Sequence, residues 1–217
     1  MTSRRKFLKT CIPAVALPFV VKAENSQVNP QHQLHPLPPG AVSLEHFLSA
    51  CTACHLCVNH CPSHVIRASF LDNGLRGMLT PVLKYDVHKF CEYECTTCID
   101  VCPTNALTKI TLEEKKLTQI GKVHLAIDNC VVIQHDEDCG ACAEHCPTAA
   151  LKMVPYKNGL TQPQITNPEM CIGCGACESI CPELKKAIYI ERLEEQTQAT
   201  PPSVEEQKEV IIDDFGF

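Results

Sequence analysis

Four runs of cysteines constrain what this chain can fold into more than any other feature. The chain has 217 residues and 17 cysteines, and sixteen of these fall into runs that each end in C-x2-C-x3-C-P. The runs recur roughly every 40 residues, a period typical of a repeated structural unit. They occupy residues 51–62, 91–103, 130–147 and 171–182. Their cysteines are Cys51, Cys54, Cys57, Cys61, Cys91, Cys95, Cys98, Cys102, Cys130, Cys139, Cys142, Cys146, Cys171, Cys174, Cys177 and Cys181.

The spacing within the runs points to cubane iron–sulfur clusters. A [4Fe–4S] cluster takes four thiolates, and the fourth cysteine of such a run usually binds the other cluster of a pair. Small residues such as Gly173, Gly175 and Ala176 let backbone N–H groups approach the inorganic sulfides. The proline after each run has no N–H and a fixed φ, so it ends the loop. We therefore predict that all sixteen cysteines ligate iron in four [4Fe–4S] clusters.

Two other uses of so many cysteines fit the sequence less well. Structural zinc normally takes two separated C-x2-4-C pairs, whereas each run here holds four cysteines closed by a proline. A disulfide framework conflicts with the export route discussed below. Histidine replaces cysteine on iron in some clusters, but the cysteines already form four full sets. We interpret the histidines as surface or hydrogen-bonding residues: His55, His60, His64, His88, His124, His135 and His145.

The third run is unusual because eight residues separate Cys130 from Cys139. Cys130 follows the strand-like segment KVHLAID, where the first cysteine of a run is expected, and it completes the fourth set. We therefore predict that it is a ligand and that Val131–Asp138 contains an insertion. The "VVI" part should turn inward and the "QHDED" part toward solvent. Its three acidic residues should disfavour an added electron and lower the potential of that cluster.

The first 23 residues resemble a twin-arginine export signal. The segment SRRKFLK carries the arginine pair, and an apolar stretch from Cys11 to Val21 is too short to span a bilayer. Cleavage is expected after Ala23, and Cys11 is interpreted as a small apolar residue of the signal. The twin-arginine translocase carries folded cargo, which favours a metal centre assembled before export and a periplasmic location. It argues against disulfides formed after unfolded export.

Composition narrows the functional classes further. The chain has no Trp and only 5% aromatic residues, so a core of ordinary density would be hard to fill. Without residues 1–23 there are 14 basic and 25 acidic residues, a net charge of −11, which disfavours nucleic-acid binding. No apolar run is long enough to span a bilayer in the mature chain. With no nucleotide-binding motif and no nucleophile constellation, we expect an electron carrier and not an enzyme.

Besides the export signal over 1–23, the chain is expected to contain three parts. A Pro-rich linker covers 24–40, the four-cluster region 41–190, and an acidic, solvated tail 191–217, with a docking peptide at its end as the alternative. A Ser-capped helix should lead into the first run. Strand-like segments are VLKYDVHKF, ALTKIT, KVHLAID, ALKMV, PQIT and AIYI. The predicted fold class is α+β, with two ferredoxin-like two-cluster modules made of short β-hairpins and helices around the clusters.

With these motifs, the region from Pro38 to Ile190 resembles bacterial polyferredoxins. It is most similar to the periplasmic, twin-arginine-exported ferredoxin-type proteins NapG and MauM, including the "PPGA" before the first helix. The four-motif layout also resembles the electron-transfer β-subunits of the dimethyl-sulfoxide-reductase family. The resemblance implies single-electron relay in anaerobic respiration. The implied partners are a membrane-bound quinol dehydrogenase or polyferredoxin as donor, and a periplasmic reductase or cytochrome as acceptor.

Two pairings of the runs are open. In a tandem arrangement, the first run shares clusters with the second and the third with the fourth. In a nested arrangement, which the β-subunit resemblance slightly favours, the first run pairs with the fourth and the second with the third. Cys61 grouped with Cys91, Cys95 and Cys98 would exclude the nested arrangement.

Two other functions remain alternatives to a free-standing relay. The chain could be the electron-transfer subunit of a larger oxidoreductase, which would then co-purify with a molybdenum or haem subunit. It could instead be a redox sensor or a cluster-assembly factor, for which labile clusters would be expected. Sixteen matched cysteines favour stable sites over labile ones.

Overall fold

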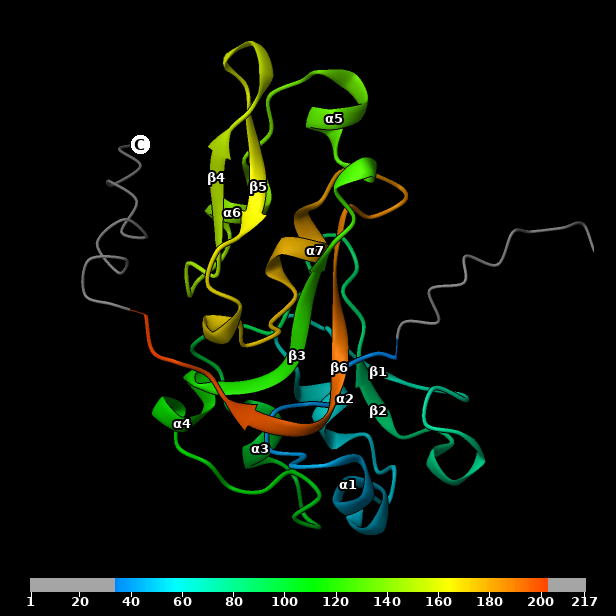
Figure 1. Cartoon of the computed structure of the whole chain (residues 1–217). Helices are drawn as coiled ribbons and strands as arrows, with labels where there is room; N and C mark the ends of the chain where they lie inside the picture. The colour runs from blue at the N-terminus through cyan, green and yellow to red at the C-terminus, as the bar shows by residue number, and fades with distance from the viewer. Residues whose placement is uncertain (1–33, 203–217) are drawn as a thin grey trace, which may run out of the picture. The chain divides into compact units, whose positions relative to one another are not determined.

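The computed structural model describes residues 34–202, which form short helices and three small antiparallel sheets (Figure 1). The α+β class predicted above is confirmed. The predicted signal over 1–23 lies outside the described residues, as do most of the linker and the end of the tail. The helices are α1 Leu44–Ala50, α2 Leu56–His60, α3 Thr97–Asp100, α4 Leu112–Lys116, α5 Val131–His135, α6 Ala141–Glu144 and α7 Ala176–Ile180. The strands are β1 Ile66–Ala68, β2 Pro81–Leu83, β3 Thr118–Leu125, β4 Leu151–Pro155, β5 Thr161–Ile165 and β6 Ile188–Gln198.

Each described helix is only one or two turns long, and the cysteine runs explain why. Most of them lie within a run or border on one, where the loop and the closing proline leave room for little more than a turn. Helix α1 is the helix predicted before the first run. Its N-cap residue Ser43 accepts a hydrogen bond from the His46 N–H at 3.2 Å, and Phe47 is buried beneath it. In the part of the chain that the structure describes, no helix is long and apolar enough to cross a bilayer.

The longest sheet pairs β3 with β6, and Figure 1 shows the two strands side by side. The pairing runs from Leu125 opposite Ile188 to Thr118 opposite Gln198, with a register shift between Gln119 and Gly121. The other sheets are the hairpins β1–β2 and β4–β5. Of the three sheets, only β3–β6 joins residues far apart in sequence, and it connects the middle of the chain to residues near its end.

Several predicted strands agree with the structure, but the segment 106–111 does not form one. It ends at Thr111, the N-cap of α4, whose side chain accepts from the Glu114 N–H while the Glu114 carboxylate accepts from the Thr111 N–H. This reciprocal capping box commits the following residues to a helix. The preceding residues form a bend and an irregular connection without a partner strand, which apolar alternation alone could not reveal.

The boundaries predicted for the linker and the tail are wrong. The expected spacer is packed against the core at its end, since Leu37 is buried and the flanking prolines Pro36, Pro38 and Pro39 are fully buried. The expected tail begins only after β6, which continues to Gln198. Gln196 explains both corrections, because its side chain accepts from the Gly40 N–H at 2.9 Å and donates to the Pro38 carbonyl at 2.8 Å. Polar residues that appear solvated in the sequence therefore pair with a Pro-rich segment that has few donors of its own.

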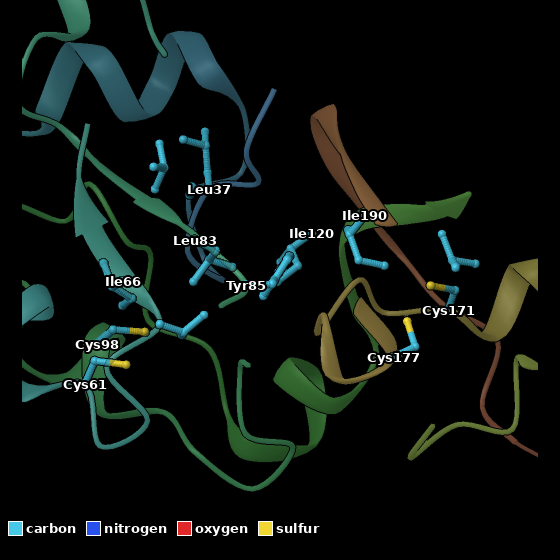
Figure 2. Close-up of a cluster of buried hydrophobic side chains, with 14 of the residues drawn as sticks. Leu37, Cys61, Ile66, Leu83, Tyr85, Cys98, Ile120, Cys171, Cys177 and Ile190 are labelled. Atoms are coloured by element: carbon cyan, nitrogen blue, oxygen red, sulfur yellow. The ribbon is translucent and has the colours of Figure 1, made fainter. Parts of the chain in front are cut away.

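The core consists of small aliphatic side chains together with cysteines. Leu37, Ile66, Leu83, Ile120 and Ile190 belong to one buried cluster that also contains cysteines from all four runs. Figure 2 shows the sulfurs of Cys61 and Cys98 on one side of this cluster and those of Cys171 and Cys177 on the other. The low aromatic content thus goes with a core whose apolar side chains fill the space between groups of sulfurs.

Truncation after Ile190 tests the corrected boundary of the tail. It removes the part of β6 that pairs with Thr118–Lys122, together with the contacts of Gln196. Since each lost hydrogen bond costs about 1 kcal/mol, the thermal unfolding midpoint followed by circular dichroism should fall by several degrees. The matched control is truncation after Pro202, which leaves every strand intact. Equal melting of the two variants would contradict the role assigned to β6.

Candidate metal centres

Four cavities in the structure are each lined by four of the sixteen run cysteines. The four cavities, called sites I to IV, are similar in size. This similarity is expected where the same group is bound four times. Site I contains Cys51, Cys54, Cys57 and Cys102, and site II contains Cys61, Cys91, Cys95 and Cys98. Site III contains Cys130, Cys139, Cys142 and Cys181, and site IV contains Cys146, Cys171, Cys174 and Cys177.

The fourth cysteine of each run crosses to the cavity of its neighbour. Cys57 lies on α2 and Cys61 directly follows it, and these two cysteines line sites I and II respectively. In the same way, Cys98 lies on α3 and Cys102 follows shortly after it, with their sites reversed. Helices α2 and α3 contact one another, as do α6 and α7 in the second half of the chain.

This exchange makes the arrangement tandem, with sites I and II in a first module and sites III and IV in a second. The nested pairing is therefore wrong. Cys61 shares its cavity with Cys91, Cys95 and Cys98, the grouping that excludes nesting. The physical reason lies in the chain between the first two runs. The hairpin β1–β2 returns the chain antiparallel to itself, so that residues near Ile66 and Leu83 face one another and the second run follows close to the first.

Two cysteine loops of the same spacing differ in sequence because they pack differently. The residues between the cysteines adopt positive φ in both loops, at Ala53 and His55 in the first run and at Gly173 and Gly175 in the fourth. A Cβ on Gly175 would lie 2.1 Å from the ring of Tyr85, so glycine is needed there. His55 instead extends toward the surface, where its Nε2 lies 2.8 Å from the Leu79 carbonyl.

The donor set fits a cluster better than a single ion. In residues 34–202, no group of three or more His, Cys, Asp or Glu side chains is close enough to hold one metal ion. The four sulfurs of each site instead line one shared cavity without being close enough to meet on a single ion. Structural zinc draws four thiolates onto one centre at about 2.3 Å. The wider spacing is what a polynuclear iron–sulfur group requires.

Burial makes these thiols hard to ionise without a bound cation. It raises the pKa of Cys57, Cys142 and Cys174 to about 12 in each case. At Cys102 burial also acts to raise the pKa, but hydrogen bonds such as that from the Leu107 N–H at 3.4 Å outweigh it and lower the pKa. A coordinated metal deprotonates a thiol outright. A bound positive charge would therefore favour the thiolate form of Cys57, Cys142 and Cys174, which burial alone disfavours.

The long gap in the third run has the burial pattern predicted for it. The insertion forms helix α5, which starts directly after Cys130, and Val132 of this helix is fully buried. The five residues of the "QHDED" segment are all exposed. Cys130 lies on the same cavity as the other cysteines of its predicted set, except that Cys181 replaces Cys146 through the exchange described above.

The histidines lie where surface or hydrogen-bonding residues are expected. His60 and His145 each contact the backbone carbonyl one helical turn earlier, at 2.9 Å. His124 contacts Glu191 at 3.0 Å, and His135 contacts Glu183 at 3.6 Å. Of the candidates, His55 is also part of the lining of site I, and its ring nitrogen points to the Leu79 carbonyl.

Sequence reasoning missed a buried lysine beside site II. Lys115 is only 3% exposed, and its ammonium donates hydrogen bonds to the carbonyls of Glu92 and Tyr93, the residues that follow Cys91. Its positive charge acts to lower the pKa of Cys91, which burial raises overall. In the sequence Lys115 and Lys116 are indistinguishable neighbours on a charged helix, so no local signal identifies the buried one.

The comparisons with known proteins support [4Fe–4S] clusters as the bound group. Two models described as a 4Fe–4S dicluster domain match the chain, one at residues 50–107 and the other at 90–150 and 137–187. The chain belongs to the ferredoxin-type proteins built from 4Fe–4S dicluster domains. It is therefore an iron–sulfur protein of the electron-transfer class that binds [4Fe–4S] clusters. The match over 90–150 joins the second and third runs, which line different cavities, because such a model detects cysteine spacing and not spatial pairing.

Curated relatives of this ferredoxin-type protein carry the names that the sequence resemblance suggested. The methylamine utilization ferredoxin-type proteins MauM from Methylobacillus flagellatus and Methylophilus methylotrophus are each 30% identical to it, over 165 and 158 residues. The ferredoxin-type protein NapG from Escherichia coli is 29% identical over 165 residues. Each match covers 70% of this chain, and 66%, 69% and 68% of the respective relative. The chain thus spans about two thirds of the length of these relatives.

Replacing Lys115 with Met should lower the reduction potential of one cluster in this ferredoxin-type protein. The change removes a buried positive charge beside site II, and such a charge favours the added electron. A shift on the order of 50 mV corresponds to a charge interaction of roughly 1 kcal/mol. An EPR-monitored redox titration measures it. The control is Lys116→Met, since that ammonium pairs with Glu94 and Glu113 on the helix surface; equal shifts in both variants would contradict a special role for Lys115.

Proposed function

We propose that this protein relays single electrons through four [4Fe–4S] clusters in the periplasm. The donor would be a membrane-bound quinol-oxidising partner, and the acceptor a periplasmic reductase or cytochrome. The observation that carries the proposal is the grouping of sixteen cysteines into four complete sets, each around its own cavity. All sixteen are assigned as iron ligands, including Cys130.

The contributions of the protein are to hold, separate and shield the redox groups. When bound, a [4Fe–4S] cluster accepts and releases one electron at a time. The cysteines fix the four positions, and aliphatic residues such as Ile120 and Ile190 exclude water from the space between the modules. Charged residues tune the sites separately, with Lys115 beside site II and the exposed acids Asp136–Asp138 beside site III. No catalytic site of its own is part of the proposal.

The cellular setting of the proposal rests on the sequence and on the relatives. The twin-arginine-like segment over 1–23 supports export as a folded, cofactor-loaded protein. NapG and MauM, which are named as ferredoxin-type proteins, support an electron-carrier role. A net charge of −11 for residues 24–217 supports docking against basic faces of partners, with association that weakens as salt increases.

Metal and sulfide analysis of anaerobically purified protein tests the proposal directly. Four cubane clusters require about 16 iron and about 16 sulfide per chain, with EPR signals of reduced clusters. About four zinc ions and no iron would refute the proposal. Reduction of the purified protein by quinol-supplied membranes, followed by reoxidation with a periplasmic fraction, tests the relay itself. Co-purification with a catalytic subunit would instead support the role of an oxidoreductase subunit.

Iron analysis of a Cys130→Ala variant tests the least regular of the proposed ligands. Iron should fall from about 16 to about 12 per chain, because site III loses one of its four sulfurs. Cys11→Ala is the matched control, since Cys11 lies outside the four runs and its loss should leave the iron content unchanged. A full iron content in Cys130→Ala would remove Cys130 from the ligand set.

Neutralising the acidic segment of the insertion should raise the potential of one cluster. Asp136, Glu137 and Asp138 are exposed next to Cys139 of site III, where their charges oppose an added electron. The triple change to Asn, Gln and Asn should shift one midpoint upward in a redox titration and leave the other midpoints in place. Replacing Glu191 and Glu194 of β6 with Gln is a control for the loss of surface charge. An unchanged set of midpoints would mean that the loop does not tune site III.

A further inference from the structure

One contact joins the two modules at the level of their ligand cysteines. The Cys91 N–H, at site II, donates a hydrogen bond of 2.9 Å to the Cys174 carbonyl, at site IV. Within residues 34–202 it is the one inter-module backbone hydrogen bond in which both residues are run cysteines. Sites II and IV are therefore neighbours at this peptide–peptide contact.

Tyr85 braces the same junction from the first module. It follows β2, is 7% exposed, and its hydroxyl donates a hydrogen bond of 2.6 Å to the Gly173 carbonyl. Its ring fills the space that a side chain on Gly175 would need, with only 2.1 Å to the position of a Cβ there. Figure 2 shows Tyr85 between the sulfurs of Cys61 and Cys98 and those of Cys171 and Cys177. The ring thus lies where the two modules meet.

Further side chains close the junction against water. Phe90, Cys91 and Tyr93 of the first module pack against a buried cluster that includes Ile172 and Cys174 of the second. The Lys115 ammonium donates hydrogen bonds to the carbonyls of the two residues that follow Cys91. A junction built from so many segments fixes the separation of sites II and IV closely.

Within each module the two sites are neighbours through the exchanged cysteines. Helix α2 connects site I to site II and contacts α3, which connects them in the opposite direction. Helices α6 and α7 contact each other and connect sites III and IV in the same way. Adding the junction of sites II and IV gives one unbranched series of neighbouring sites.

We propose that the two modules exchange electrons where Cys91 meets Cys174, so that the sites are ordered I, II, IV, III, with Tyr85 as the positioning residue of the junction. The proposal rests on the relay function above and adds its internal order. This order differs from the order of the runs along the sequence, because the fourth run and not the third meets the first module.

The burial of the cysteines agrees with this order. All four cysteines of site IV are buried, as expected for an internal position. Site II is intermediate, with Cys61 and Cys98 buried and the other two of its cysteines partly exposed. At site III three of the four cysteines are partly exposed, and site I alone has a fully exposed one, Cys54. Sites I and III are therefore the ends at which electrons enter and leave.

Spin coupling between reduced clusters tests the order in the full, cluster-loaded chain. Cys171→Ala should vacate site IV, and Cys139→Ala should vacate site III, as matched single-ligand changes. With site IV vacated, site III should give an isolated EPR signal, while sites I and II stay coupled. With site III vacated, the coupling between sites II and IV should persist. Persistent coupling between sites II and III after the loss of site IV would overturn the order.

A second pair of variants keeps the test decisive if a vacated site prevents folding. Tyr85→Leu removes the ring and the hydroxyl from the junction while leaving all sixteen ligands in place. The coupling between sites II and IV should weaken, and the couplings within each module should not change. Tyr189→Leu is the matched control, because its ring stacks on His124 at 5.3 Å on the β3–β6 sheet. Identical coupling in wild type and Tyr85→Leu would overturn the role given to Tyr85.

Iron analysis separates a failure of this inference from a failure of the proposed function. Fewer than four clusters in the wild-type protein would defeat the four-cluster relay itself. Four clusters whose couplings follow the order I, II, III, IV would leave the relay in place and defeat the internal order alone.

Discussion

The exchange of the fourth cysteine between neighbouring runs is the constraint on which the rest of the structure depends. Cys61 and Cys102 cross between sites I and II, and Cys146 and Cys181 cross between sites III and IV. Because each cavity needs sulfurs from two segments, no run can complete a site alone. The helices can therefore be a turn or two long, and the apolar core needs only to fill the space between the sites.

Two long-range elements convert these pairs of sites into one electron-transfer unit. The β3–β6 sheet brings the end of the chain back along the second module and onto the Pro-rich segment before α1. The junction of Tyr85, Cys91 and Cys174 then places one module against the other. Lys115 and the acidic segment after α5 give two sites opposite electrostatic surroundings. Chemically identical clusters placed in these sites would therefore differ in potential.

Predictions from the sequence succeeded where the signal was local. The N-cap at Ser43 predicted α1, and the apolar and acidic halves of the long insertion predicted which of its residues are buried and which are exposed. They failed where the partner is distant in sequence. The polar residues after Ile190 gave no sign of their pairing with β3, and the nested pairing came from a resemblance to proteins with the same motif order. Lys115 and Lys116 look alike in the sequence, but only Lys115 is buried, against the distant segment that contains Tyr93.

By itself the sequence determined that the protein binds iron–sulfur clusters. The spacing of the cysteines and the closing proline form loops whose thiolates can bind such a cluster. It also determined the α+β class and four runs of four cysteines, since these follow from local repeats. Only the tertiary structure decided which sulfurs share a cavity, which sites adjoin, and why Gly175 cannot be replaced by a residue with a side chain. These depend on contacts between segments tens of residues apart, such as Tyr85 with Gly173, and no local pattern specifies such contacts.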